Sequence, residues 1–207
     1  MKLAASQELH AYWNLLRGAR SAPERSEIDP SAIRGVLADT FILEVDRAKR
    51  YPIRISGTRT NSLFARELKG GAFIDLWQPS DQREIARLLA CVADEATAMV
   101  AGVSTRPSSA QPLDLELLLL PLRHHGDTHA RVLGAFSPAS LPSWLGLFPA
   151  GPMSLLSLRM LDRADSKART KSAPAYDDPA AATSFGRTAS ADRRGHLFVL
   201  EGAAQQR

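Results

Sequence analysis

Cysteine is nearly absent from this chain of 207 residues, which contains Cys91 alone. A single thiol closes no intramolecular disulfide and builds no multi-thiolate metal site, so a disulfide scaffold and a cysteine-based zinc centre are both excluded. The sequence also lacks a long apolar run. Nothing in it approaches the roughly 18 to 20 residues that span a bilayer, and the start, MKLAASQELHAYW, has no apolar segment of signal-peptide length. We therefore expect a soluble cytoplasmic protein with no membrane partner.

Charge of one sign is not concentrated anywhere in the first three quarters of the chain. There are 26 Lys and Arg against 22 Asp and Glu, a net charge of +4, and the two signs are interspersed. Nucleic-acid binding usually needs a basic stripe or patch. This distribution therefore favours an ordinary solvated surface over a nucleic-acid interface.

Large apolar residues become rare after residue 162. Residues 163–194 are rich in Ala, Ser, Thr, Pro, Asp and Arg, a composition that cannot offset the entropy of ordering. The sequence therefore predicts a folded domain at 1–162 followed by a disordered basic tail at 163–207. One short apolar run in that tail, 196–200, either adds as a strand to a sheet edge or stays unfolded.

Apolar residues at helical spacing predict four helices. These are 7–17, a segment that begins at 29–30, 57–65 and 81–100. The first has Leu9, Trp13 and Leu16 on one stripe, and Ser6 and Gly18 are suited to its two ends. The last has a long apolar stripe that must lie across a sheet.

Alternating apolar residues predict five strands. These are 40–46, 51–56, 112–122, 130–136 and 154–161. A short charged turn joins the first two, which indicates a hairpin. In the third strand Asp114 and Glu116 alternate with leucines, so we expect both carboxylates to face solvent and to take no part in acid–base chemistry.

Five short motifs carry a resemblance to a known family. They are YWNLLRG at 12–18, SEIDP at 26–30, ISGT at 55–58, LFARELKG at 63–70 and FIDLW at 73–77. Together with the order of elements, they resemble the bacterial PAS-like family of the PAS_5 type, formerly a domain of unknown function. The resemblance spans about 6–162. It implies an α+β fold in which helices cross one face of a five-stranded antiparallel sheet, with an N-terminal helical cap, a small central cavity, and a role in sensing or protein association.

The cofactors of other PAS proteins do not fit the residues of this chain. Several relatives hold haem through a histidine on a helix over the sheet, yet 81–100 contains no histidine. Flavin-binding photoreceptors place a reactive cysteine in the context Asn-Cys-Arg-Phe-Leu-Gln, whereas Cys91 stands in Leu-Ala-Cys-Val-Ala. We therefore expect neither haem nor flavin, and Cys91 is interpreted as a buried, inert thiol.

Histidines between two predicted strands offer the best metal spacing in the sequence. His124, His125 and His129, with Asp127 as a fourth ligand, could hold zinc or copper. The favoured interpretation is a polar loop between two strands, so no metal is expected.

Four positions are possible cavity or turn residues. Gly57 and Thr58 stand between a strand and a helix, where they form either a tight turn or a weak anion site built from free backbone amides. Phe64 and Trp77 line either a cavity or the ordinary core.

These observations favour a PAS-type sensory or adaptor domain that acts through protein–protein association. The partner would be a second copy of the chain or a separate signalling protein, and the candidate dimer interface is the stripe of Leu9, Trp13 and Leu16. No nucleophile elbow is present, so no catalytic residue is assigned. The alternative hypothesis is a small α+β enzyme or carrier that binds an apolar ligand, which a pocket with convergent polar groups would favour.

Overall fold

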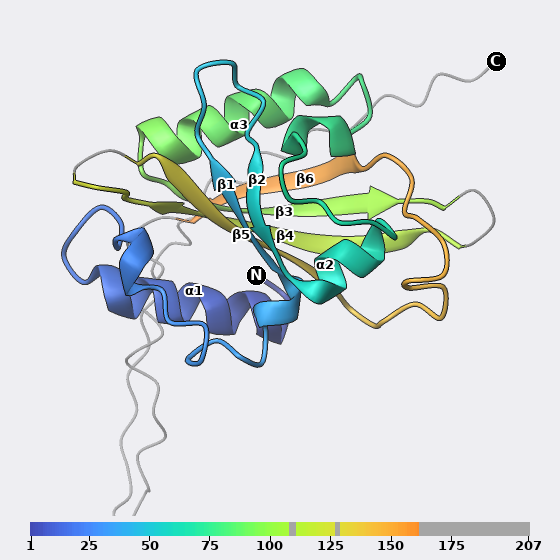
Figure 1. Cartoon of the computed structure of the whole chain (residues 1–207), viewed down its shortest axis with the longest axis horizontal. Coiled ribbons are helices and arrows are strands. Elements are labelled where there is room, and N and C mark those ends of the chain that lie inside the picture. The colour runs from blue at the N-terminus through green and yellow to red at the C-terminus, as the bar shows by residue number, and fades with distance from the viewer. Residues whose placement is uncertain (108–110, 127–128, 162–207) are drawn as a thin grey trace, which may run out of the picture. The chain divides into compact units, whose positions relative to one another are not determined.

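The computed structural model describes residues 1–107, 111–126 and 129–161 (Figure 1). The predicted tail 163–207, with its apolar run 196–200, lies outside these residues. The described residues form an antiparallel sheet of six strands in the order β2-β1-β5-β4-β3-β6. The strands are β1 (Thr40–Glu44), β2 (Ile53–Ser56), β3 (Ala98–Thr105), β4 (Leu113–Leu122), β5 (Arg131–Pro138) and β6 (Ser154–Leu161).

Helices lie on both sides of this sheet. They are α1 (Ala4–Arg17), α2 (Thr58–Leu63), α3 (Gln82–Asp94) and the short 3-10 helices η1 (Arg25–Glu27), η2 (Leu37–Asp39) and η3 (Phe73–Leu76). Figure 1 shows α1 on the opposite side of the sheet from α3. Helices α2, η3 and α3 pack in the core on one face, as expected, and the N-terminal helix α1, the expected helical cap, covers the other face. No helix in the described part of the chain is long and apolar enough to cross a membrane.

Strand β4 shows why both faces need cover. Its leucines are buried in alternation, with Leu117 and Leu119 in the core under α3 and Leu118 and Leu120 in a second core under α1. Successive side chains of a strand point to opposite faces, so an unbroken apolar run is stable only where both faces are covered. The N-terminal helix supplies the second cover.

The sheet has six strands because the predicted helix 81–100 ends early. Helix α3 stops at Asp94, and Ala96, with φ of 52°, turns the chain into β3. Strand β3 pairs with β4 on one side and β6 on the other, and both of its faces are largely buried. Its apolar residues therefore follow those of α3 along the sequence, and the apolar pattern does not visibly change where the helix ends. Periodicity alone does not separate a buried strand from the end of a buried helix.

The helix predicted to begin at 29–30 is also wrong. Residues 30–36 form successive turns, and only η2 follows as a short 3-10 helix. Ile33 and Val36 are nevertheless buried in the core under α1, as their apolar character requires. Gly35, a poor helix former, stands between them.

Helix α1 is capped from the sheet. The predicted cap, Ser6, lies inside the helix and is buried next to Ser137, while Leu3 occupies the N-cap position without a side-chain bond. The backbone N–H groups of Lys2 and Leu3 donate to the carboxylate of Glu116 on β4 at 2.7 and 3.3 Å. The expectation that Glu116 simply faces solvent is therefore wrong, because its charge lies at the positive end of the helix dipole.

Candidate functional site

Aromatic rings fill the space between the sheet and α3. Phe41 on β1 lies 4.9 Å from Phe136 on β5, measured between ring centroids, and 5.2 Å from Phe73 on η3. All three side chains are at most 2% exposed. These rings occupy the centre of the core, where the resemblance implied a small cavity.

Phe64 and Trp77 extend this ring cluster in two directions. Phe64 meets Phe136 edge-on at 6.3 Å, and Trp77 lies 5.9 Å from Phe73. Both side chains are buried in the same core, and the Trp77 indole nitrogen has no hydrogen-bond partner there. The fold thus brings these two predicted positions together around shared rings, in core packing.

Gly57 and Thr58 form a tight turn from β2 into α2. The Gly57 N–H donates to the Thr40 carbonyl at 2.8 Å, and a Cβ on Gly57 would overlap the carbonyl oxygens of Leu37 and Ala38. Glycine is required here because two stretches of backbone approach each other closely. Thr58 is the exposed first residue of α2.

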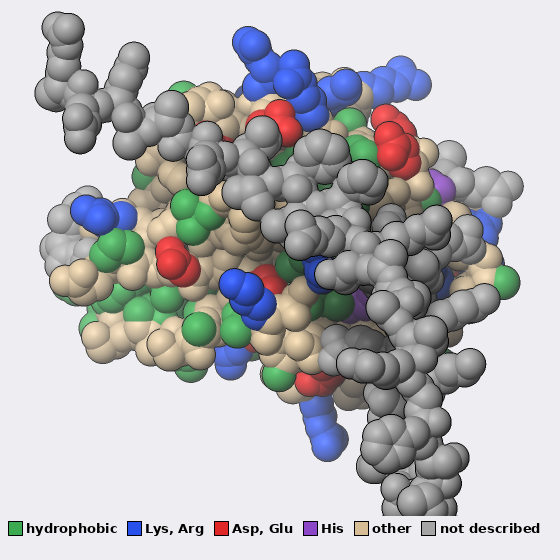
Figure 2. Space-filling view, turned by 180° about the vertical axis from the view of Figure 1, so that it is seen from behind, with side chains coloured by type: hydrophobic (Ala, Val, Ile, Leu, Met, Phe, Trp, Pro, Cys, Tyr) green, Lys and Arg blue, Asp and Glu red, His purple; other side chains and the backbone are tan. Residues whose placement is uncertain are grey.

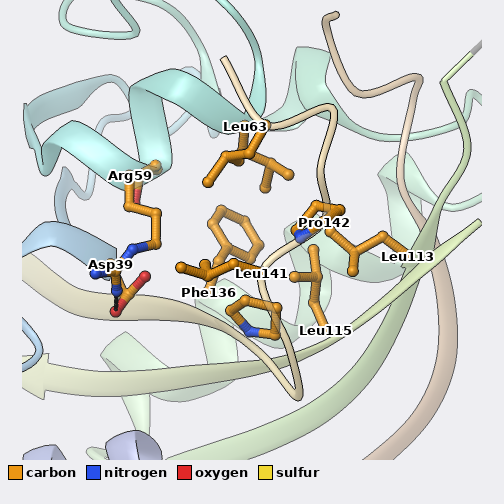
Figure 3. Close-up of a pocket in the computed structure, with 11 residues that line it drawn as sticks. Asp39, Arg59, Leu63, Leu113, Leu115, Phe136, Leu141 and Pro142 are labelled. Carbon is orange, nitrogen blue, oxygen red and sulfur yellow. Dashed lines mark hydrogen bonds and ion pairs between the residues drawn. The ribbon is translucent and has the colours of Figure 1, made fainter. Parts of the chain in front are cut away.

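A hollow beside this turn contains three polar residues that the sequence did not single out. Asp39, at the end of η2, forms an ion pair with Arg59 on α2, and Thr60 follows Arg59 in the wall. The Asp39 side chain is 6% exposed and that of Arg59 is 34% exposed. Figure 3 shows this pair on one side of the hollow, facing apolar side chains across it.

The electrostatics of Asp39 are set by two opposing effects. Burial raises the pKa of its carboxyl group, and the hydrogen bond and charge of Arg59 lower it, with burial the larger effect. No sequence signal marks this pair, because the two residues are 20 positions apart in unrelated motifs. Only the contact between η2 and α2 brings them together.

The connection between β5 and β6 is a second feature that sequence reasoning missed. Backbone hydrogen bonds hold it against α2: the Gly146 N–H donates to Ser62 at 3.1 Å and the Ala150 N–H donates to Leu63 at 2.8 Å. Trp144 buries its ring, yet Leu147 and Phe148 remain 71% and 47% exposed. We call residues 139–150 the strap.

The candidate dimer stripe faces the chain's own sheet. Leu9 and Trp13 are 0% and 1% exposed, Leu16 is half-buried, and the Trp13 indole N–H donates to the Pro121 carbonyl at 2.8 Å. The stripe therefore serves intramolecular packing in the single chain. The large apolar side chain that α1 presents to solvent is Leu15, which is 80% exposed.

The histidine loop is held by local contacts. His124 and His125 lie 4.0 Å apart between ring centroids, and Nε2 of His129 shares a hydrogen bond of 2.9 Å with the Ser21 hydroxyl. Asp127 is not among the described residues. In the part of the chain that the structure describes, no three His, Cys, Asp or Glu side chains come close enough to hold a metal. Burial is the first cause that lowers the pKa of His124.

Cys91 lies half-buried on α3. Burial raises the pKa of its thiol, and a hydrogen bond with Glu95 raises it further. Both effects disfavour the thiolate, which is the nucleophilic form. The environment of Cys91 thus fits an unreactive thiol.

Surface charge is mixed on the face opposite the view of Figure 1. Figure 2 shows acidic and basic side chains interspersed there, with exposed apolar side chains between them. A mixed surface of this kind attracts neither polyanions nor polycations over long range. The nucleic-acid hypothesis gains no support from this face.

Comparison with known proteins identifies a family. Residues 1–137 match the family model described as PAS domain, a span that includes β1 to β4 and most of β5. No curated protein matches the chain.

Solved structures give a weaker likeness. The light-state structure of the LOV domain of the blue-light photoreceptor Aureochrome1 is 13% identical, over 53% of this chain and 88% of that one, with a TM-score of 0.41. A LOV protein of Rhodobacter sphaeroides is 10% identical over 66% and 69%, with a TM-score of 0.41. An RNA-binding light-oxygen-voltage receptor is 14% identical over 60% and 36%, also with a TM-score of 0.41. At such scores nothing about ligands or light carries over, and the assignment rests on the family match: the chain belongs to the PAS domain family.

Proposed function

We propose that this PAS domain is a sensory or adaptor module that acts by binding another protein, either a second copy of the chain or a separate signalling protein. The observation that supports association is the strap. Its backbone is fixed to α2 by hydrogen bonds and its Trp144 is buried, so Leu147 and Phe148 are held in place although they are exposed. Phe is enriched in protein interfaces, and neighbouring exposed apolar side chains are a feature of protein interaction sites.

Measurement of the association state tests this proposal. The full chain is followed by sedimentation velocity across a dilution series, with Leu147→Asp as the interface variant. Leu15→Asp on α1 is the matched control, because Leu15 is at least as exposed as Leu147 and its replacement should not unfold the chain. If the strap is the interface of a homodimer, Leu147→Asp weakens the dimer and Leu15→Asp does not. The reverse result assigns association to α1.

A separate partner requires a second experiment. If the chain is monomeric at every concentration, an affinity capture with wild type, Leu147→Asp and Leu15→Asp compares the proteins retained by each. The proposal expects a partner that the wild type retains and Leu147→Asp loses. A monomeric chain whose captured proteins are identical for all three would overturn it.

A further inference from the structure

The two outer strands of the sheet differ in how their free edges are covered. Strand β2 has four residues, and the segment 70–73 runs along its outer side. The Ile53 N–H donates to the Gly71 carbonyl at 2.9 Å, and the Gly70 N–H donates to the Ile53 carbonyl at 2.7 Å. Arg54 adds an exposed charge to this short strand. A covered and charged edge of this kind resists pairing with a further strand.

Strand β6, at the other edge of the sheet, is covered only where it begins. The Leu155 N–H donates to the Asp81 carboxylate at 2.9 Å, and a bulge then leaves Leu156 without a register partner on β3. Residues 157–161 pair regularly with β3 on their inner side, and the described chain offers them no backbone partner on their outer side. This stretch of edge is therefore open to another extended backbone.

The side chains of β6 suit contact with another strand. Leu156 and Met160 are 55% and 43% exposed although both are large and apolar. The strand is eight residues long and has a single charged side chain, Arg159. Long edge strands with apolar side chains and little charge are the ones that pair with other chains.

We propose that two copies of this chain pair through the outer edges of β6, antiparallel and about a two-fold axis. Each copy brings the same row of free N–H and C=O groups, so one contact satisfies both rows. Because the other edge of the sheet is covered, such pairing closes after two copies and does not continue into a fibre. The contact is small, so the dimer is reversible and depends on concentration.

The one charge of β6 determines the register of this pair. In an antiparallel pair with two-fold symmetry, one residue lies opposite its own copy. Arg159 at that position would bring two guanidinium groups together, which is unfavourable. With Met160 there, the pairing would extend past Leu161, the last residue of β6. With Leu158 at the axis, Arg159 lies opposite Ser157 of the partner subunit, and the like charges are kept apart.

This interface is distinct from the strap. Leu147 and Phe148 take no part in it, so the strap remains available to a separate signalling protein. The pairing of β6 therefore goes beyond the function proposed above and does not depend on it, because substitutions at the two surfaces separate their effects.

Charge at position 157 tests the pair and its register together. Ser157 is exposed, so its replacement should leave the fold intact. Ser157→Glu places a carboxylate opposite Arg159 of the partner subunit twice in each dimer, and Ser157→Lys places a like charge there. Sedimentation velocity of the full chain at low salt should show a dimer about threefold or more tighter for Ser157→Glu and about threefold or more weaker for Ser157→Lys. Equal dissociation constants for the two variants overturn the proposal.

Matched changes elsewhere separate this contact from the effect of net charge. Ser31 is exposed on the turns before η2, so Ser31→Glu and Ser31→Lys change the net charge equally without touching β6. Both should dimerise as the wild type does. If the two Ser31 variants differ as much as the two Ser157 variants do, net charge alone governs association and the proposal fails.

Hydrogen exchange at several protein concentrations locates the contact. The outward amides of 157–161 should gain protection as the dimer fraction rises, and more than those of β2. Protection that is equal at every concentration would mean that one chain covers its own edge, and a dimer without this protection would place the interface elsewhere. Either result overturns the proposal, as does a chain that stays monomeric. A dimer weakened by Leu147→Asp and not by Ser157→Lys overturns it too, while supporting the strap.

Discussion

The ring of Phe41 lies directly over Gly134, its register partner on the neighbouring strand β5. A Cβ added to Gly134 would overlap the ring itself, so this glycine is needed for space. An aromatic side chain that covers a glycine on the adjacent strand also replaces the cross-strand contact that glycine lacks. The ring cluster of the core therefore depends on the smallest residue of β5.

Replacing Gly134 with alanine should destabilise the fold. Overpacking of a tight core typically costs about 1 to 3 kcal/mol. Gly35→Ala is the control, because its Cβ would meet only the Glu8 carboxylate at 3.4 Å. Urea unfolding measures both changes. Combining Gly134→Ala with Phe41→Leu should recover part of the loss, and strict additivity of the two changes would contradict the overlap.

The two buried tryptophans should respond differently to loss of the indole nitrogen. Trp13→Phe leaves the Pro121 carbonyl without its donor, which costs about 1 to 3 kcal/mol in addition to the lost ring area. Trp77→Phe loses a similar area but removes an N–H that has no hydrogen-bond partner among the described residues. We expect Trp13→Phe to be the more destabilising by about 1 kcal/mol or more in thermal or urea unfolding. A larger cost for Trp77→Phe would indicate that its indole does have a partner.

The cap that the sheet provides to α1 is testable by charge removal. Glu116→Gln keeps the shape of the side chain but removes the negative charge from the helix N-terminus. We expect a loss of about 0.5 to 1 kcal/mol in the free energy of unfolding, smaller at high salt. Asp114→Asn, two residues earlier on the same face of β4 and exposed, should have little effect. Equal effects of the two substitutions would refute the cap.

Tyr51 should make the fold sensitive to alkali. Its hydroxyl donates to the Ala86 carbonyl at 3.1 Å, and burial, followed by the charges of Asp94 and Asp46, raises the pKa of Tyr51 to about 12. The folded chain thus holds this proton more tightly than the unfolded chain, where the pKa is about 10. The stability that Tyr51 contributes is fully present below about pH 10 and is lost as the pH rises toward 12.

Unfolding free energies measured from pH 8 upward check this, together with phenolate absorbance. The Tyr51→Phe chain should lose less stability over that interval than the wild type. An identical slope in both chains would show that the Tyr51 phenol titrates equally in the folded and unfolded states.

Much of the fold could be predicted from the sequence, because local patterns determined it. Strands β1, β2, β4, β5 and β6 and helices α1 and α2 all lie where alternation and helical spacing predict them. Strand β3 was missed because both of its faces are buried. The face of the sheet that α1 covers was not predicted, since a single apolar stripe on α1 does not say which face it packs against.

The candidate site was less accessible to sequence reasoning. For Phe64 and Trp77 the sequence leaves open a cavity wall or ordinary core packing, and both side chains lie in the core. The Asp39–Arg59 pair and Thr60 have ordinary side chains in ordinary contexts, and only long-range packing buries them. These polar groups are of interest because they are buried, and only the folded structure shows that they are buried.

The hydrogen bond between Trp13 and Pro121 also bears on how the chain is made. Its two partners are 108 residues apart. A ribosome that adds about 5 to 20 residues per second needs roughly 5 to 20 s to bring β4 out after α1. During that interval Leu9 and Trp13 have no sheet to cover them. The nascent chain therefore exposes the apolar face of α1, which favours chaperone binding or aggregation. Changes to the N-terminal helix should therefore alter the expression yield more than they alter the stability of the finished domain.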